Sequence, residues 1–320
     1  KSRYTRGVRE ETMQPFRKNL AIAIDGGGMR GLVVTRALTM LEAALGQPLK
    51  ERVRLTTGTS TGSIISAGLA CGLTAAHIHE LYLTLGKSIF KTTWRSALWP
   101  LTKYRYTSAP LENALREVLG DLKMGDFWKR QPPLAVVITA FDLQTNKSCF
   151  IKPYKAEYQH WPVVKAVLAS SSAPTFFPPV EGRYLDGGVG AYYNPCFLAA
   201  YEANFCLDWK AEETTLLSIG TGRNPPWLKP DQAANFWAWQ WIGPIEDGFL
   251  DSTDDQQVHL VETFFPKLDF RRYQVDLREP IEMDRADKMD ELVTYGEQLG
   301  QMILNDQFDR ALGIRPALPK

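Results

Sequence analysis

A serine between two glycines is the side chain best placed by its neighbours to act as a nucleophile. It lies in the run Gly58-Thr59-Ser60-Thr61-Gly62, which fits the pattern Gly-x-Ser-x-Gly. The run follows a β-prone segment and precedes a helical pattern, which is the context of a nucleophile elbow. The helix that begins there favours a developing negative charge. We therefore predict that Ser60 is a nucleophile and that Gly58 and Gly62 keep the turn tight. A helix-capping serine in a structural turn is the alternative.

A second glycine-rich run, Asp25-Gly26-Gly27-Gly28-Met29-Arg30-Gly31, follows an apolar segment and precedes another helical pattern. Consecutive glycines leave backbone N–H groups uncovered, and fixed N–H donors of this kind form oxyanion holes. The spacing of Gly26, Gly28 and Gly31 also fits the dinucleotide pattern Gly-x-Gly-x-x-Gly. That pattern needs an acidic residue at the end of the second strand, and the serine turn occupies this place instead. An oxyanion hole is therefore favoured over a nucleotide site or a plain structural loop.

A candidate base lies in Asp186-Gly187-Gly188, directly after a short β-prone segment. An aspartate at a strand end beside two glycines can reach into a cleft, but on these residues alone a turn aspartate is the favoured interpretation. The upstream segment, residues 169–179, contains three prolines and is too broken for a helix. Serine is a weak nucleophile and needs a base. If Asp186 served as that base, burial would have to raise its pKa, because an ordinary aspartate is too acidic for this task at neutral pH.

The four histidines offer an alternative base. The chain order Ser60, Asp186, His259 is that of an α/β-hydrolase triad. However, His259 lies in a segment with a helical pattern rather than in a loop at a strand end. His77 and His79 are two residues apart on a predicted helix, so they lie on different faces and make poor metal ligands. The cysteines form no Cys-x-x-Cys pair, and we predict neither a metal site nor a cofactor.

The elements that must position these residues alternate between strand and helix. Apolar runs bounded by glycine predict strands at 20–24, 53–57, 134–141, 183–185, 214–219 and 270–275, and helical spacing predicts helices at 31–45, 63–69, 163–170, 194–203, 231–262 and 284–312. This alternation predicts an α/β fold with three layers, α/β/α, and a mostly parallel central sheet. We expect a polar arm at 1–18 and a single domain at 19–320, of which 226–320 is mainly helical.

Composition excludes several classes of protein. The chain has 320 residues, of which 44% are hydrophobic and 23% charged, so it is neither disordered nor a coiled coil as a whole. A net charge of +1 argues against a nucleic-acid-binding protein. No apolar run approaches the length of a transmembrane helix. Four cysteines in a chain of this length favour a reduced, cytoplasmic location, although a secreted protein is not excluded.

A basic and aromatic stretch between Leu81 and Leu111 contains no acidic residue. Basic and aromatic side chains together suit the headgroup layer of anionic membranes. The candidates for this membrane interface are Lys91, Trp94, Arg95, Trp99 and Lys103. A second aromatic cluster consists of Trp227, Phe236, Trp237, Trp239 and Trp241. Both sets could instead form part of the core or wall an acyl-chain pocket.

In this order, the motifs make the chain resemble the patatin-like phospholipases, a family of lipid acyl hydrolases. The resemblance rests on the glycine run at 25–31, the serine turn at 58–62, the Ala-Ser-x-x-Ala-Pro segment at 169–174, Asp-Gly-Gly at 186–188 and Leu-Ser-Ile-Gly-Thr-Gly at 217–222. It implies that Ser60 is the nucleophile and Asp186 its sole side-chain partner. It also implies that the N–H groups of Gly27, Gly28, Met29 and Arg30 form the oxyanion hole.

The resemblance further implies a phospholipid or other acyl-ester substrate, no cofactor and peripheral association with a membrane. The region after residue 225 matches the family only loosely. Two other functions remain open on the residues alone. One is a serine esterase with a Ser60–Asp186–His259 triad, and the other is a regulatory module that binds a nucleotide or a lipid without catalysis.

Overall fold

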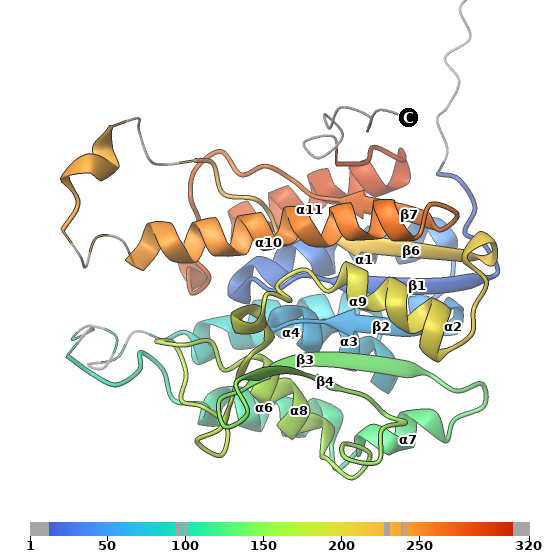
Figure 1. The fold of residues 1–320 in the computed structure, drawn as a ribbon, viewed down its shortest axis with the longest axis horizontal. Coiled ribbons are helices and arrows are strands. Elements are labelled where there is room, and N and C mark those ends of the chain that lie inside the picture. The colour runs from blue at the N-terminus through green and yellow to red at the C-terminus, as the bar shows by residue number, and fades with distance from the viewer. Residues whose placement is uncertain are drawn as a thin grey trace, which may run out of the picture.

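A twisted seven-stranded sheet forms the centre of the molecule (Figure 1). The computed structural model describes residues 13–309 apart from residues 92, 94, 95, 97, 99, 100, 227–230, 238, 239 and 241, and it gives only the backbone of 242–252. The strands are β1 (Asn19–Ile24), β2 (Val53–Gly58), β3 (Ala135–Asp142), β4 (Lys147–Ile151), β5 (Tyr184–Asp186), β6 (Thr214–Ile219) and β7 (Asp269–Tyr273). Their order is β4-β3-β2-β1-β6-β7, and β5 also pairs with β3.

The centre of the sheet is parallel, whereas β4 and β5 pair with β3 in the antiparallel direction. The central strand β1 shows why these residues form a sheet with two covered faces. Its larger side chains, such as Ile22, pack on one face, and Ala21 and Ala23 pack on the other; all are fully buried. A strand buried on both faces needs a continuous apolar sequence, which is what this segment has.

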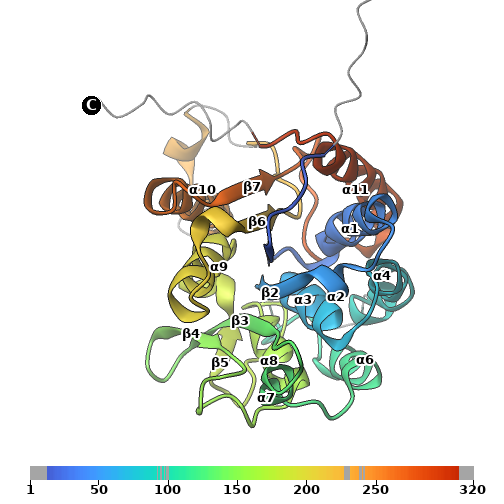
Figure 2. The ribbon, with the colours of Figure 1, turned by 90° about the vertical axis from the view of Figure 1, so that its right-hand side faces the viewer.

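Helices cover both faces of the sheet (Figure 2). They are α1 (Gly31–Leu45), α2 (Leu49–Arg52), α3 (Thr61–Cys71), α4 (Ala75–Ile89), α6 (Ala109–Leu119), α7 (Met124–Trp128), α8 (Val163–Ser170), α9 (Cys196–Tyr201), α10 (Ile242–Phe264) and α11 (Met289–Leu304). Helices α9 and α10 pack on the face that carries Ala21, and α1, α3, α4 and α11 pack on the opposite face. The predicted three-layer α/β/α architecture with a mostly parallel sheet in a single domain is therefore confirmed.

Several predicted elements differ from the structure. The expected helix at 231–262 is a short 3-10 turn at Gln232–Asn235 followed by α10, which begins only at Ile242. The sequence interpretation missed β4, which forms a hairpin with β3, because its exposed face breaks the apolar run. None of the helices in the described part of the chain is long and apolar enough to cross a membrane.

Candidate active site

Ser60 lies in the turn between the carboxyl end of β2 and the first residue of α3. Its backbone has φ 54° and ψ −122°, a conformation that non-glycine residues rarely adopt. The Ser60 N–H donates a hydrogen bond of 2.9 Å to the side-chain oxygen of Ser170, the last residue of α8. Strain of this kind persists only where the surroundings hold it, and it occurs at active sites.

The two flanking glycines allow the turn to close. A Cβ atom on Gly58 would lie 2.2 Å from the Gly62 carbonyl oxygen, and one on Gly62 would lie 2.2 Å from the Ile24 carbonyl oxygen. Both atoms are backbone, so neither can move aside for a side chain. Small residues are therefore required at these two positions because the backbones of β1, β2 and α3 approach each other closely there.

Asp186 ends β5, and the pairing of β5 with β3 brings it beside the serine turn. Its carboxylate accepts a hydrogen bond of 2.8 Å from the Gly188 N–H, and the Ser60 hydroxyl lies near enough to lower its pKa. The residue is only 6% exposed. Burial raises the pKa of Asp186 to about 6, and the Gly188 N–H and the Ser60 hydroxyl oppose this rise by favouring the charged form.

The glycine turn between β1 and α1 lies against the same site. Gly27 has φ 151° and Gly28 φ 56°, both of which favour glycine. The Met29 N–H donates to the Met283 carbonyl oxygen at 2.7 Å, and the Arg30 N–H donates to the Gly27 carbonyl oxygen at 3.0 Å. Within the described ranges, no protein group accepts the N–H of Gly27 or Gly28. Only these two of the four predicted donors are thus open to a ligand.

A buried ion pair holds the start of this turn. The Asp25 carboxylate accepts hydrogen bonds of 2.9 and 2.6 Å from the Arg272 guanidinium of β7. Burial raises the pKa of Asp25 to about 7 even though the arginine lowers it. Arg272 also contacts Asp254 of α10, so the pair ties the turn to both β7 and the far helical layer. A bidentate pair of this kind fixes direction as well as distance.

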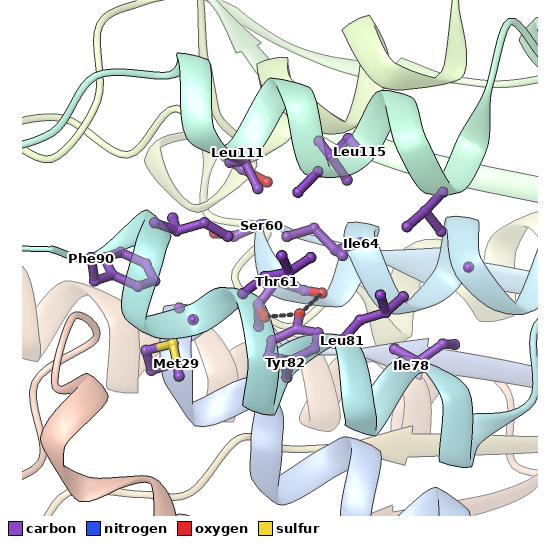
Figure 3. A pocket seen from close by; sticks show the side chains of 18 of the residues that line it. Met29, Ser60, Thr61, Ile64, Ile78, Leu81, Tyr82, Phe90, Leu111 and Leu115 are labelled. Carbon is purple, nitrogen blue, oxygen red and sulfur yellow. Dashed lines mark hydrogen bonds between the residues drawn. The ribbon is translucent and has the colours of Figure 1, made fainter.

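Two cavities meet at Ser60. The first, the helical cavity, lies between α3, α4 and α6 and has an empty volume of about 970 Å³, including its opening to solvent. Figure 3 shows Ile64, Leu81 and Leu115 pointing into it from the three helices. The second, the Asp186 cavity, lies on the other side of the serine and is lined by Asp186, Gly188, Val189 and Tyr193. Both cavities also share Ser60, Ala173, Phe176 and Met283.

The histidines lie elsewhere. His259 is exposed on α10 and lines neither cavity, so it has no contact that would complete a triad. His77 is exposed, and His79 Nδ1 lies 2.9 Å from the Thr35 hydroxyl. In the described part of the chain, no group of three or more His, Cys, Asp or Glu side chains could hold a metal ion. All four cysteines are free thiols.

The predicted membrane segment is described only in part. Lys91 and Lys103 are exposed, whereas Trp94, Arg95 and Trp99 lie outside the described residues. Leu101 is 87% exposed, and Trp237 of the second aromatic cluster is 67% exposed. Figure 1 shows that the chain around residue 101 and the turn near residue 235 project from the same side of the molecule. Trp227, Trp239 and Trp241 also fall outside the described residues, and Phe236 is half-buried.

The sequence interpretation missed two residues that shape the site. Ser170 lies in the segment 169–174 that the motif analysis singled out, but its hydrogen bond to the Ser60 N–H depends on the packing of α8 beside α3. Met283 lies in the region after residue 225, which carries no motif. Only the fold brings its carbonyl oxygen to the Met29 N–H.

Comparisons with known proteins show the family of this chain. The sequence model described as "Patatin-like phospholipase" matches residues 22–200, which is more than half of the chain. The chain therefore belongs to the patatin-like phospholipase family. It is 29% identical over 221 residues to an intracellular phospholipase A2 of Caenorhabditis elegans, covering 64% of this chain and 19% of that protein. It is also 29% identical over 223 residues to a cGAMP-activated phospholipase of Escherichia coli strain TW11681, covering 62% of this chain and 61% of that protein.

Among solved structures, VipD from Legionella pneumophila is similar with a TM-score of 0.48 and 13% identity, covering 92% of this chain and 67% of that chain. The two phospholipases named above are longer than the part that this chain matches. The chain covers 19% of the first and 61% of the second, which is less than two thirds of each.

Proposed function

We propose that this protein is a lipid acyl hydrolase of the phospholipase A type that uses Ser60 as nucleophile and Asp186 as its base. One observation carries the proposal: Ser60 and the buried Asp186 carboxyl line the same cavity, at the point where two cavities meet beside uncovered backbone N–H groups. A nucleophile, a base and oxyanion donors around one open position are the elements of acyl transfer.

In the first half of the reaction, Asp186 accepts the hydroxyl proton while the Ser60 oxygen bonds to the carbonyl carbon of the ester. The carbonyl oxygen becomes an oxyanion, which the N–H groups of Gly27 and Gly28 stabilise. One such donor typically contributes about 2.7–4 kcal/mol. When the carbon–oxygen bond to the alcohol breaks, Asp186 returns its proton to the leaving alcohol. The products of this half are an acyl-serine and a free alcohol.

In the second half, Asp186 accepts a proton from water, and the water oxygen attacks the acyl-serine. Collapse of the oxyanion releases the fatty acid and returns the proton to Ser60. The raised pKa of Asp186 suits both halves, because a base works best when its pKa lies near the working pH. No histidine is needed to carry the proton in this scheme, since Asp186 lines the same cavity as Ser60 and the Ser60 hydroxyl lies near enough to lower its pKa.

The two cavities support a direction for the substrate. The helical cavity is lined almost entirely by apolar side chains, which favours a fatty acyl chain. The Asp186 cavity then holds the alcohol, next to the carboxylate that protonates it. Phospholipids are the proposed source of this acyl chain, since the relatives include phospholipases. We also propose that the protein reaches them as a peripheral protein through the exposed segment around Lys103. Because one relative is a cGAMP-activated phospholipase, a small-molecule activator of this protein should also be sought in the assay.

Covalent labelling tests this proposal. A fluorophosphonate with a long alkyl chain should label the protein once, and peptide mass spectrometry should place the label on Ser60. Ser60→Ala should abolish labelling and the release of fatty acid from phosphatidylcholine vesicles. Ser63→Ala is the matched control, because Ser63 lies in the first turn of the same helix and its hydroxyl donates to the Ser60 carbonyl oxygen. A Ser60→Ala protein that still released fatty acid at the original rate would contradict the assignment.

A further inference from the structure

Residues Met283 and Asp284 lie between the glycine turn and a distant part of the chain, Arg105 and Tyr106. Met283 contacts the glycine turn through its backbone, and Asp284 contacts Arg105 and Tyr106 through its side chain. The two contacts come from consecutive residues, so a single peptide group joins them.

The contact with the glycine turn is tight. The Met283 carbonyl oxygen accepts the Met29 N–H at 2.7 Å. A Cβ atom on Gly28 would lie 2.3 Å from the same oxygen, so the Gly28 backbone packs directly on it. Because Met29 follows Gly28, this hydrogen bond sets the orientation of the peptide group that joins them. The Gly28 N–H, one of the two proposed oxyanion donors, lies one peptide further back.

The contact on the other side is polar and mostly shielded from water. The Asp284 carboxylate accepts a hydrogen bond of 2.9 Å from the Tyr106 hydroxyl and one of 3.3 Å from the Arg105 guanidinium. The side chains of Asp284 and Arg105 are 12% and 24% exposed. Hydrogen bonds to a charged group are stronger than neutral ones, and partial burial reduces their screening.

Arg105 and Tyr106 are themselves fixed to the cavity wall. Their N–H groups donate to the carbonyl oxygens of Thr175 and Phe176, and the Arg105 guanidinium lies 4.6 Å from the centre of the Phe176 ring. The Tyr106 ring packs against Phe90 and Phe177, with ring centres 5.4 and 5.9 Å away. Asp284 therefore joins an aromatic wall of the helical cavity to the segment that contacts the glycine turn.

We propose that Asp284 is a positioning residue that, through Met283, holds the Gly28 N–H in the orientation needed for the oxyanion. This role rests on the proposed function, in which Gly27 and Gly28 supply the oxyanion donors. Asp284 touches no reacting atom. Its effect should appear in the rate of the chemical step rather than in the binding of a small ester, because a small displacement of a catalytic group lowers kcat strongly.

The test uses Asp284→Ala, Asp284→Asn, Tyr106→Phe and the double variant Tyr106→Phe/Asp284→Ala. The measurement is kcat on a short p-nitrophenyl ester, divided by the concentration of sites that a fluorophosphonate labels. Asp284→Ala should lower this kcat about tenfold, with KM changed less than about twofold. Asp284→Asn keeps an oxygen that can accept from Tyr106 and should recover part of the loss. The double variant should be no slower than Asp284→Ala, because both substitutions remove the same hydrogen bond between Tyr106 and Asp284.

Tyr273→Phe is the matched control, because Tyr273 also donates its hydroxyl to an aspartate, Asp306, at 3.3 Å. It should leave kcat per labelled site unchanged. An Asp284→Ala protein with unchanged kcat per labelled site and only a lower melting temperature would overturn the positioning role. Additive losses in the double variant, or an equal loss in the control, would also overturn it. If the unsubstituted protein is not labelled at Ser60, the proposed function fails and the positioning role fails with it.

Discussion

The Ser170 side-chain oxygen accepts the backbone N–H of Ser60 at 2.9 Å, and this contact explains why the end of α8 belongs to the site. The Asp186 N–H in turn donates to the Ser172 carbonyl oxygen at 3.1 Å. One short segment therefore touches the backbone of both the proposed nucleophile and the proposed base. It contacts both residues through their backbones, and the proposed mechanism gives no step to either of these two serines.

The proposed dyad and the triad give opposite expectations for two variants. Asp186→Asn should lower kcat on a short ester nearly as far as Ser60→Ala does, because the amide cannot accept the hydroxyl proton. His259→Ala should keep most of the activity, since His259 is exposed on α10 and lines neither cavity. The rates should be compared on folded protein, checked by circular dichroism. An inactive but folded His259→Ala protein would restore the triad.

The pH dependence of turnover should follow the ionisation of Asp186. The residue must be ionised to accept a proton, and burial raises its pKa to about 6. We therefore expect kcat/KM on a soluble neutral ester to be constant above pH 7 and to fall about tenfold per pH unit well below pH 6. A rate that stays level from pH 8 down to pH 4.5 would show that no group with this pKa acts as the base.

The same carboxyl group should reduce the stability of the fold at neutral pH. Its pKa is higher in the folded state than in the unfolded chain, so the folded state binds more protons between about pH 4 and pH 6. Stability from this group is therefore greatest below pH 4 and is lost as the pH rises through 6. The full difference is at most about 3 kcal/mol, from 1.36 kcal/mol per pKa unit.

Asp186→Asn removes this effect because the amide does not ionise. The variant should unfold at a higher denaturant concentration than the unsubstituted protein at pH 8, and the two should converge near pH 4. Asp121→Asn, an exposed position, is the control and should show no such trend. A difference between Asp186→Asn and the unsubstituted protein that is the same at both pH values would contradict the raised pKa.

Local sequence patterns predicted those parts of the fold and of the site whose structure depends on a few adjacent residues. The strand that contains Ile22 and the glycines around Ser60 have requirements that a few adjacent residues meet, so their positions were predicted within one or two residues. The rise in the pKa of Asp186 was also expected, because an ordinary aspartate is too acidic to act as a base at neutral pH and burial in an apolar cleft raises its pKa.

Contacts between distant parts of the chain were not predicted. The Asp25–Arg272 pair joins residues 247 positions apart, and no local pattern marks Arg272 as the partner of a buried acid. The use of the Met29 and Arg30 N–H groups inside the protein depends in the same way on Met283 and on the closed geometry of the turn. The sequence indicated four oxyanion donors, whereas the fold leaves two without a protein acceptor in the described ranges.

The helical cavity should determine the preference for acyl-chain length. Leu115 is 5% exposed and projects into this cavity from α6 (Figure 3). Leu115→Phe should fill part of the cavity and lower kcat/KM for esters with chains of sixteen carbons about tenfold or more, while esters with four carbons react at nearly the original rate. Leu143→Phe, in an exposed turn, is the control. Equal losses on both esters would place the acyl chain elsewhere or indicate a damaged core.

The exposed segment around Lys103 should contribute to binding on anionic membranes. Lys91→Gln, Arg95→Gln and Lys103→Gln combined should weaken binding to vesicles that contain phosphatidylserine by about a hundredfold at low salt, since each basic residue near such a surface contributes about 1 kcal/mol. The difference should shrink at 1 M salt, where the Debye length is about 3 Å. Hydrolysis of a soluble short ester should stay nearly unchanged, because Ser60 and Asp186 are intact.

The control for this triple variant replaces three exposed lysines elsewhere by glutamine and changes the net charge equally. These lysines are Lys129, Lys147 and Lys155. Equal binding by the two triple variants would show that only net charge matters, and equal loss on vesicles and on the soluble ester would point to a damaged fold.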